Sequence, residues 1–237
     1  MGKKRLLAAV RRQDLPFLEE LCGRPDAFCV DLDRPYGRLG CVIMASGMGR
    51  RFGGNKLLEE FGGKPLFLRA LEATEGIFAA RVAVTRHREV EELCCGRNVP
   101  AVLHDLPCRS DTVRLGLEAV AGPGLPGGIE GCLFCPADQP LLRRETVASL
   151  ALCAAAGPEW IWRAAWKGRE GAPALFPSWA FAELRTLPEG GGGRLLMERF
   201  RHRVRTVQAR EEAELWDVDS REDLERLKLH WKTSRMG

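Results

Sequence analysis

Short apolar runs alternate with helical patterns from Gly40 onward, and this alternation limits the fold more than any other feature of the sequence. Four apolar runs have the length of strands, at residues 41–45, 81–85, 101–104 and 131–135. Apolar residues recur at helical spacing in four segments that follow them, at residues 65–74, 89–95, 111–120 and 144–155. Strands that alternate with helices predict a mostly parallel sheet covered on both faces. The sequence therefore predicts a three-layer α/β/α fold.

The pattern changes after the fourth helical segment. Strand-like runs at 160–166 and 172–176 flank a polar turn at 167–171. Such a hairpin predicts a small subsidiary β element beside the main sheet. The remaining expected elements are helices at 178–185, 194–200 and 220–231, a glycine loop at 190–193 and a strand at 204–207. Ser220 followed by Asp223 is a capping arrangement for the last helix.

The first part of the chain has a different pattern. Apolar residues at 6–10 and 15–21 predict one or two short amphipathic helices, with Pro16 as a break between them. At 237 residues, the chain is long enough for one large domain with an appendage. We expect an amino-terminal extension of unknown role over residues 1–39 and a single domain over residues 40–232.

Composition excludes several classes of protein. With 45% hydrophobic and 29% charged residues, the chain is neither disordered nor fibrous. Its 36 Lys and Arg against 32 Asp and Glu leave a net charge of +4 without long blocks of like charge, so we expect no nucleic-acid partner. No apolar run approaches the ~18 residues of a membrane span, and we expect no membrane partner. A small anion is the favoured ligand.

The nine cysteines, an odd number, are scattered and often lie inside apolar runs. Thiols used as small hydrophobic residues are typical of a reducing compartment, which predicts a cytoplasmic protein. The apolar run near the start is shorter than the ~7 residues that a signal peptide needs. The four histidines, at 87, 104, 202 and 230, are too far apart in sequence to suggest a ligand set.

Residues 42–56 connect an apolar strand to a glycine-rich, basic loop. Glycines allow backbone N–H groups to approach a phosphate closely. Gly47 and Gly49 alone are equally compatible with a simple turn, but Arg51 and Lys56 in the same segment favour an anion site. The order of residues matches neither a Walker loop nor a dinucleotide-binding loop.

This segment carries a resemblance to a known family. IMASGMGRRFGGNK at 43–56 and GGKPL at 62–66 are similar to the L-A-x-G-x-G-x-R-[MF]-G…K…G-K-P-L signature of the MobA-like nucleotidyltransferases. Four more motifs follow in the family's order, and they are CPADQPL at 135–141, GAPALF at 171–176, the glycine loop at 190–193 and DVDSREDL at 217–224. The resemblance covers about residues 40–230 and is strongest to the molybdenum cofactor cytidylyltransferase branch. It implies a Rossmann-like nucleotidyltransferase fold.

The resemblance also implies roles for individual residues. Arg51, Lys56 and Asp138 are the expected catalytic residues, and the first two would contact the triphosphate and steady the leaving pyrophosphate. The expected nucleotide-binding residues are Ala45, Ser46, Gly47, Gly49, Arg51, Lys56, Pro136 and Ala137. Glycine-loop residues Gly191 and Gly192, with Arg194, are the expected acceptor-binding residues.

Physical chemistry supports these roles independently. Attack on the α-phosphorus of a nucleoside triphosphate needs in-line geometry, neutralised charge and a metal ion that holds the phosphates. Asp138 ends an apolar strand at the carboxyl edge of the predicted sheet, where ligands gather, and a carboxylate suits Mg²⁺. Asp219 is the expected second metal ligand, with Asp217 as the next choice. A helix N-terminus alone explains Asp223.

Two differences from the guanylyltransferase branch indicate which nucleobase the protein binds. In the guanylyltransferase branch the first loop reads A-G-G and a cysteine precedes the metal-binding acid. This chain has Ala45-Ser46-Gly47 and Pro136-Ala137-Asp138, which favour cytidine. Ser46 is placed to reach the edge of the base. Where the branch has a glycine-to-serine stretch after the third strand, this chain has residues 108–114, in which Ser110 and Asp111 are expected to cap the next helix.

The sequence thus predicts transfer of CMP from CTP to the phosphate of a molybdopterin-type cofactor, with Mg²⁺ and with release of pyrophosphate. A molybdenum hydroxylase apoenzyme is a possible recipient of the product. One alternative keeps the enzyme class but changes the substrates, to GTP or to a sugar phosphate. A second alternative is a non-catalytic maturation factor that binds the cofactor and delivers it to the hydroxylase.

Overall fold

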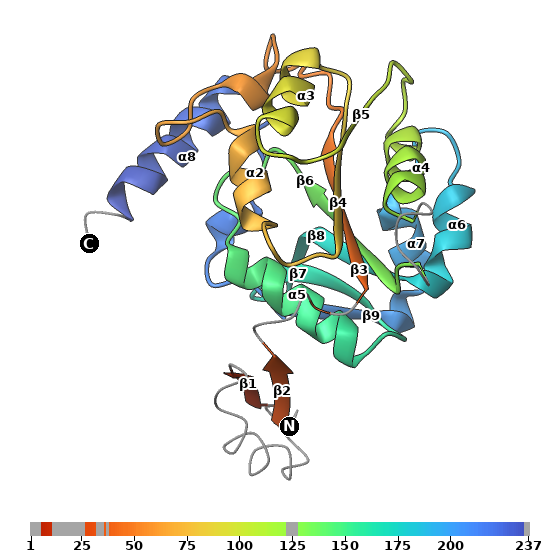
Figure 1. Ribbon diagram of the computed structural model, residues 1–237. Helices are drawn as coiled ribbons and strands as arrows, with labels where there is room; N and C mark the ends of the chain where they lie inside the picture. The colour runs from red at the N-terminus through yellow and green to blue at the C-terminus, as the bar shows by residue number, and fades with distance from the viewer. Residues whose placement is uncertain (1–5, 11–26, 32–35, 37, 122–127, 235–237) are drawn as a thin grey trace.

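A computed structural model describes residues 6–10, 27–31, 36, 38–121 and 128–234 (Figure 1). A seven-stranded sheet has the order β5-β4-β3-β6-β8-β7-β9. Its strands are β3 Leu39–Ala45, β4 Ala80–Thr85, β5 Ala101–Leu103, β6 Gly131–Pro136, β7 Ile161–Trp166, β8 Arg169–Pro177 and β9 Val204–Gln208. The inner strand β3 is buried along almost its whole length because helices cover both faces of the sheet.

The predicted mostly parallel sheet is confirmed. Strand β3 pairs in parallel with β4 and β6, β4 with β5, and β7 with β9. Only β8 is antiparallel to its neighbours β6 and β7 in this described sheet. The β7–β8 hairpin is therefore hydrogen-bonded into the main sheet and does not lie apart from it. Because β8 runs against β6, its first residues lie at the same edge as the end of β6.

The helices form two layers on opposite faces of the sheet (Figure 1). One layer contains α2 Phe67–Ala73, α3 Arg88–Cys95, α5 Arg144–Ala156 and α8 Arg221–Thr233, and the other contains α4 Arg109–Val120, α6 Phe181–Arg185 and α7 Gly193–Arg199. Short 3₁₀ turns occur at η2 Lys56–Leu58, η3 Ser178–Ala180, η4 Arg201–Arg203 and η5 Glu212–Leu215. The four strands and four helices predicted before residue 156 are present, with ends shifted by two residues or fewer.

Alternate side chains of the strands enter two separate apolar cores. Val42 belongs to the core that also contains residues of α4 and α6, whereas Ile43 belongs to the core that also contains residues of α2 and α5. The same alternation separates Cys132 from Cys135. These two thiols point to opposite faces of the sheet and are not placed to hold one metal ion.

The expected helix at residues 6–10 is wrong. Leu6–Val10 is strand β1, which pairs in parallel with β2, Ala27–Asp31, in a separate two-stranded sheet. An apolar run of five residues does not distinguish a strand from one face of a helix, so pairing with a partner strand decides between them. Residues 15–21, the rest of that prediction, lie outside the described residues.

The segment after β9 returns to the carboxyl edge of the sheet. The Val218 N–H donates to the Asp138 carbonyl oxygen at 2.9 Å, which places residues 217–219 beside the end of β6. The predicted cap of α8 is confirmed, since the Asp223 N–H donates to Ser220 Oγ at 3.1 Å and the Ser220 N–H donates to the Asp223 carboxylate at 2.9 Å. Trp231 of the same helix packs on Phe61.

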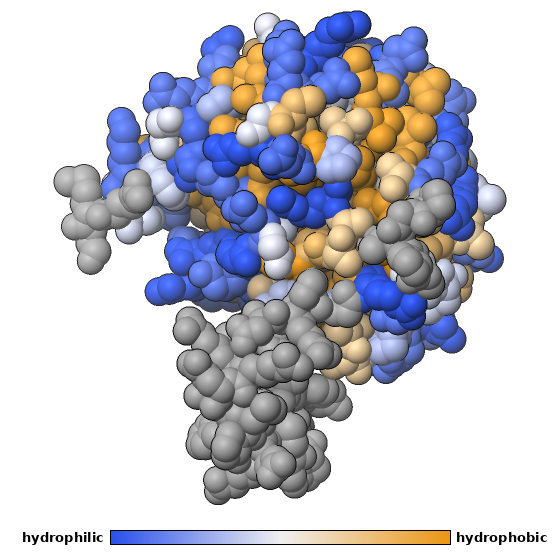
Figure 2. Space-filling view, in the orientation of Figure 1, coloured by the Kyte–Doolittle hydropathy of each residue, from blue (hydrophilic) through white to orange (hydrophobic). Residues whose placement is uncertain are grey.

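Polar residues cover most of the face seen in Figure 2, and apolar residues gather near the β5–α4 connection. Leu103 and Leu106 are exposed there, at 38% and 37% of their surface. None of the described helices is long enough and apolar enough to cross a bilayer.

Candidate active site

The first loop of the site follows β3 and depends on one glycine for its shape. Gly49 has φ +55°, and a Cβ at this position would lie 2.1 Å from the carbonyl oxygen of Gly54. No other residue fits this turn without strain. At Gly47, by contrast, a Cβ would meet no atom within 4 Å. The fold requires Gly49, whereas Gly47 leaves open space beside the backbone.

Lys56 lies at the centre of the site, in the 3₁₀ turn that ends the loop. Its side chain is nearly buried, and Nζ donates to Asp138 Oδ2 at 2.7 Å and to the Val218 carbonyl oxygen at 2.5 Å. Asp219 Oδ1 lies 3.5 Å from the same nitrogen. One ammonium group thus connects the end of β6 to the segment that precedes α8.

Arg51 completes this group of charges. Its Nη1 lies 3.2 Å from Asp219 Oδ2, and its side chain is 81% exposed. The structure therefore brings together the four charged residues that the sequence predicts for the triphosphate and the metal ion. We call Arg51, Lys56, Asp138 and Asp219 the charge cluster.

Asp217 adjoins the charge cluster. The residue as a whole is exposed, yet burial of its carboxyl group raises its pKa to about 6, and the charge of Asp138 adds to this effect. A hydrogen bond from the Gln139 side chain acts in the opposite direction. With its pKa raised to about 6, Asp217 is mostly ionised near pH 7 and gains a proton as the pH falls below about 6.

The sequence indicates Asp217 only as the next choice after Asp219, and it does not single out Gln139. Gln139 is buried, and its Nε2 donates to the Leu215 carbonyl oxygen at 3.3 Å. The sequence signal that could have indicated Gln139 is its position directly after Asp138.

Two histidines support the opposite end of the loop. Ser46 Oγ contacts the Val84 carbonyl oxygen at 3.0 Å and His104 Nε2 at 2.8 Å. His87 Nε2 lies 3.1 Å from the Gly47 carbonyl oxygen. The sequence analysis considered these histidines only as metal ligands, and it did not predict their contacts with the loop. Each histidine follows the end of a parallel strand, and such ends meet at one edge of a sheet.

Three further nucleotide-binding residues of the prediction lie at the same edge. Pro136 ends β6 opposite Met44 of β3. The next residue, Ala137, is buried, and its N–H donates to the Met44 carbonyl oxygen at 3.2 Å. Ala45 is the last residue of β3 and is also buried. These contacts hold the segment before Asp138 against the start of the glycine-rich loop.

The expected acceptor-binding loop lies at the N-terminus of α7. A Cβ on Gly193 would come within 2.5 Å of the Phe176 ring, and one on Gly192 within 3.0 Å of Arg109 Cδ, so the loop packs tightly. Arg194 is exposed and pairs with Glu198 at 2.8 Å. Among the described residues, no hydrogen bond or ion pair joins Gly191, Gly192 or Arg194 to the charge cluster.

The cap of α4 is partly as predicted. Asp111 accepts a hydrogen bond from the Cys108 N–H at 3.1 Å, which confirms its capping role. Ser110 is not the N-cap, because the helix begins one residue earlier, at Arg109, and Ser110 is buried in its first turn. Cys108 is the N-cap residue.

The donor set of the charge cluster fits a hard divalent cation. Asp138 and Asp219 offer carboxylate oxygens, and the Lys56 ammonium already lies between them. Within the described residues no group of three or more His, Cys, Asp or Glu side chains is placed to hold a metal ion. Two protein carboxylates with substrate oxygens and water are a usual arrangement for Mg²⁺.

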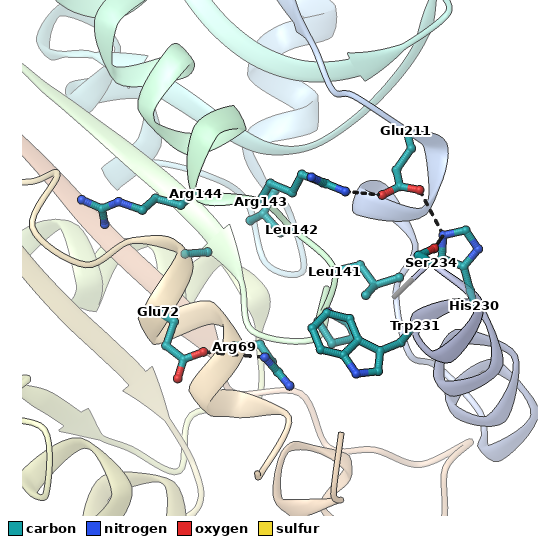
Figure 3. A pocket seen from close by; sticks show the side chains of 12 residues that line it. Arg69, Glu72, Leu141, Leu142, Arg143, Arg144, Glu211, His230, Trp231 and Ser234 are labelled. Carbon is teal, nitrogen blue, oxygen red and sulfur yellow. Dashed lines mark hydrogen bonds and ion pairs between the residues drawn. The ribbon is translucent and has the colours of Figure 1, made fainter. Parts of the chain in front are cut away.

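A cavity of about 340 Å³ lies beyond the loop that follows Asp138 (Figure 3). Its lining includes Arg69, Leu141, Arg143, Glu211 and Trp231. None of the residues predicted for the site lines it. Arg143 pairs with Glu211 at 2.9 Å across the cavity wall, and Glu211 in turn contacts His230 at 3.1 Å (Figure 3).

The pair of Arg143 and Glu211 predicts a pH-dependent contribution to stability. The hydrogen bond from Arg143 lowers the pKa of Glu211, with a smaller contribution from His230. A carboxyl group whose pKa is lower in the folded state than in the unfolded state stabilises the fold at pH values above its unfolded pKa. This stabilisation is lost as the pH falls through the folded pKa. We expect Arg143→Met to reduce the free energy of unfolding near neutral pH and to have less effect near about pH 3.

Urea unfolding of both proteins at the two pH values measures this difference. Arg199→Met is the matched control, because Arg199 pairs with Glu183 on the exposed surface and such pairs contribute little. An equal loss of stability at both pH values for Arg143→Met would contradict the prediction.

Comparisons with known proteins add independent information. Residues 41–206 match the MobA-like NTP transferase domain. Rv0371c from Mycobacterium tuberculosis H37Rv has a similar structure, with a TM-score of 0.69 and 20% identity over 81% of this chain and 98% of that one. The same protein has been solved in complex with manganese, and that structure matches with a TM-score of 0.66 and 21% identity over 81% and 98% of the two chains.

Two other structures extend the comparison. A nucleotidyl transferase of Methanothermobacter, Mth528, has a TM-score of 0.68 and 22% identity over 83% of this chain and 99% of that one. A CMP:2-keto-3-deoxy-manno-octonic acid synthetase in complex with CTP has a TM-score of 0.63 and 15% identity over 84% and 100%. At these identities, the structural similarities establish a shared fold.

Proposed function

This chain belongs to the MobA-like NTP transferase family, and we propose that it transfers CMP from CTP to the phosphate of a molybdopterin-type cofactor and releases pyrophosphate. The observation that carries the proposal is the charge cluster. Arg51 and Lys56, which suit a polyphosphate, lie in direct contact with Asp138 and Asp219, which suit a divalent ion.

Phosphate binding follows from the loop as well as from the cations. The backbone of residues 46–50 follows a strand at the carboxyl edge of the sheet, where Gly47 leaves space for a close approach. Exposed Arg51 has freedom to turn from Asp219 toward a phosphate oxygen. Lys56 is nearly buried and supplies a fixed positive charge.

Mg²⁺ is the proposed metal ion, and Asp138 and Asp219 would hold it. The manganese complex of Rv0371c supports a divalent cation on a related structure. When bound, the ion neutralises phosphate charge and helps to hold the triphosphate in line. Lys56 Nζ contacts both carboxylates, which holds Asp138 and Asp219 close together.

The reaction forms one phosphorus–oxygen bond and breaks another. An oxygen of the acceptor phosphate forms a bond to the α-phosphorus of CTP, and the bond between the α-phosphorus and its bridging oxygen to the β-phosphate breaks. Pyrophosphate leaves with the electron pair, and Arg51 and Lys56 stabilise its charge. A phosphate monoester is already anionic near neutral pH, so the protein's task is to position the reactants.

CTP is the proposed nucleotide because Ser46 and Ala137 stand where the guanylyltransferase pattern has glycine and cysteine. The related synthetase in complex with CTP supports this choice of base. The glycine loop at 190–193 and Arg194 are the proposed acceptor-binding segment, near the first residues of α4 that Gly192 contacts.

Pyrophosphate release tests the proposal. The purified protein is incubated with Mg²⁺ and a molybdopterin-type cofactor, and CTP, GTP, ATP and UTP are compared, with each triphosphate alone as the control. We expect release with CTP that depends on the cofactor. Turnover with GTP alone would overturn the cytidine assignment, and turnover with a sugar phosphate instead of the pterin would overturn the acceptor. Binding of the pterin without release from any triphosphate would indicate the carrier alternative.

A further inference from the structure

The hydroxyl group of Ser46 has two fixed partners, and together they determine where its hydrogen points. The Val84 carbonyl oxygen, 3.0 Å away, is only an acceptor. The single hydroxyl hydrogen therefore goes to Val84, and Ser46 must accept at its second contact, 2.8 Å from His104 Nε2. This network assigns the proton of the neutral His104 ring to Nε2.

The environment of His104 agrees with this tautomer. Its Nδ1 is buried and has no hydrogen-bond partner among the described residues. An unpaired acceptor is tolerated better than an unpaired buried N–H, so the bare nitrogen belongs at Nδ1. Burial, followed by the charge of Arg86, lowers the pKa of His104, which keeps the ring neutral near pH 7.

Ser46 consequently faces the site as an acceptor only. A hydroxyl oxygen has two acceptor positions, and His104 occupies one of them. The other is free to receive a hydrogen bond, and Ser46 is partly exposed. With its own hydrogen engaged by Val84, the group has none to offer to a ligand.

The strand order places Ser46 on the side of β3 away from the charge cluster. Val84 and His104 lie on the β4–β5 side of β3, whereas Lys56 and Asp138 lie on the β6 side. A nucleotide whose phosphates lie at the charge cluster and which extends along this edge has its base near Ser46. Leu103 and Leu106, close to His104 in the chain, are exposed apolar residues.

We propose that Ser46, held as an acceptor by Val84 and His104, selects a base with an amino group at its edge and discriminates against uracil. The inference rests on the proposed function and deepens it, since it concerns the base of the same nucleotide. The amino group of cytosine donates a hydrogen bond to the Ser46 oxygen. Uracil has a carbonyl oxygen at that position, and two acceptor oxygens facing each other form no hydrogen bond. Ser46 is the specificity residue, and His104 is a positioning residue that acts through it.

Calorimetric titration of the full chain with CTP and with UTP, each with Mg²⁺, tests the proposal without an acceptor. We expect the wild-type protein to bind CTP about tenfold more tightly or better. Ser46→Ala is expected to bring the ratio of the two dissociation constants close to one. His104→Phe is expected to lower the ratio because Ser46 loses the N–H that fixes it. His104→Gln carries an amide N–H at a similar reach and is expected to restore much of the preference.

His87→Phe is the matched control, because His87 contacts the same loop at Gly47 and does not contact Ser46. This variant is expected to keep the wild-type ratio. Equal affinity of the wild-type protein for CTP and UTP would overturn the inference, and so would an unchanged ratio in both Ser46→Ala and His104→Phe. In either case the proposal of CMP transfer would still stand if pyrophosphate is released. Failure to bind any triphosphate would overturn both proposals. Thermal unfolding checks that each variant is folded, and the His104 variants test the inference if Ser46→Ala is not.

Discussion

Asp138→Asn is expected to reduce the rate of CMP transfer by about 10³-fold or more. Asparagine keeps the shape of the side chain but removes the negative charge that the proposed metal ion requires. Lys56 retains the Val218 carbonyl oxygen and Asp219 as partners, so the fold should survive the change. Steady-state release of pyrophosphate measures the rate, and calorimetry with Mn²⁺ and CTP measures whether binding of the metal is weakened.

Glu225→Gln is the control for this experiment. It removes a carboxylate from an exposed pair with Lys228 on α8, away from the charge cluster. We expect its rate to equal that of the wild-type protein. If Asp138→Asn also kept the wild-type rate, the protein would not be the proposed enzyme, and the carrier alternative would account better for the charge cluster.

Lys56→Met is expected to lower the rate by about 10²-fold or more and also to reduce the stability of the protein. Methionine fills much of the same space, but it removes the cation that joins Asp138 to Asp219. The two carboxylates then repel each other across a partly buried site. Lys56→Arg is not expected to restore activity, because the planar guanidinium group is larger and distributes its hydrogen bonds differently.

Arg51→Met separates the catalytic effect from the structural one. Arg51 is mostly exposed, so removing its ion pair with Asp219 should cost little stability while still slowing the release of pyrophosphate. Urea unfolding and pyrophosphate release are measured on both variants. A Lys56→Met protein with normal turnover would show that the ammonium group has no part in the reaction.

The fold was largely predictable because strands buried on both faces leave continuous apolar runs in the sequence. Residues 131–135 are an example, since both sides of this run are buried. The place of the β7–β8 hairpin was not predictable in the same way. Pairing of β8 with β6 joins residues about 40 positions apart, and local periodicity does not record such contacts.

The candidate site was also predictable only in part. Motif order indicated Arg51, Lys56, Asp138 and Asp219, and the parallel topology brings these segments to one edge. The sequence did not indicate that the cations pair with the carboxylates, because this depends on the path of residues 209–219. The contact between Ser46 and His104 was also hidden, since it depends on how β3, β4 and β5 are ordered.

Val218 links the backbone of Asp138 to the ammonium group of Lys56 through its own main chain. Its N–H binds the backbone of Asp138, and its carbonyl oxygen binds the Lys56 ammonium. Every residue except proline offers the same peptide N–H and carbonyl groups, so these two contacts do not depend on the chemistry of the side chain at this position. A protein engineer is therefore free to rebuild the rim of the site for another base or acceptor while the reaction centre keeps its dimensions.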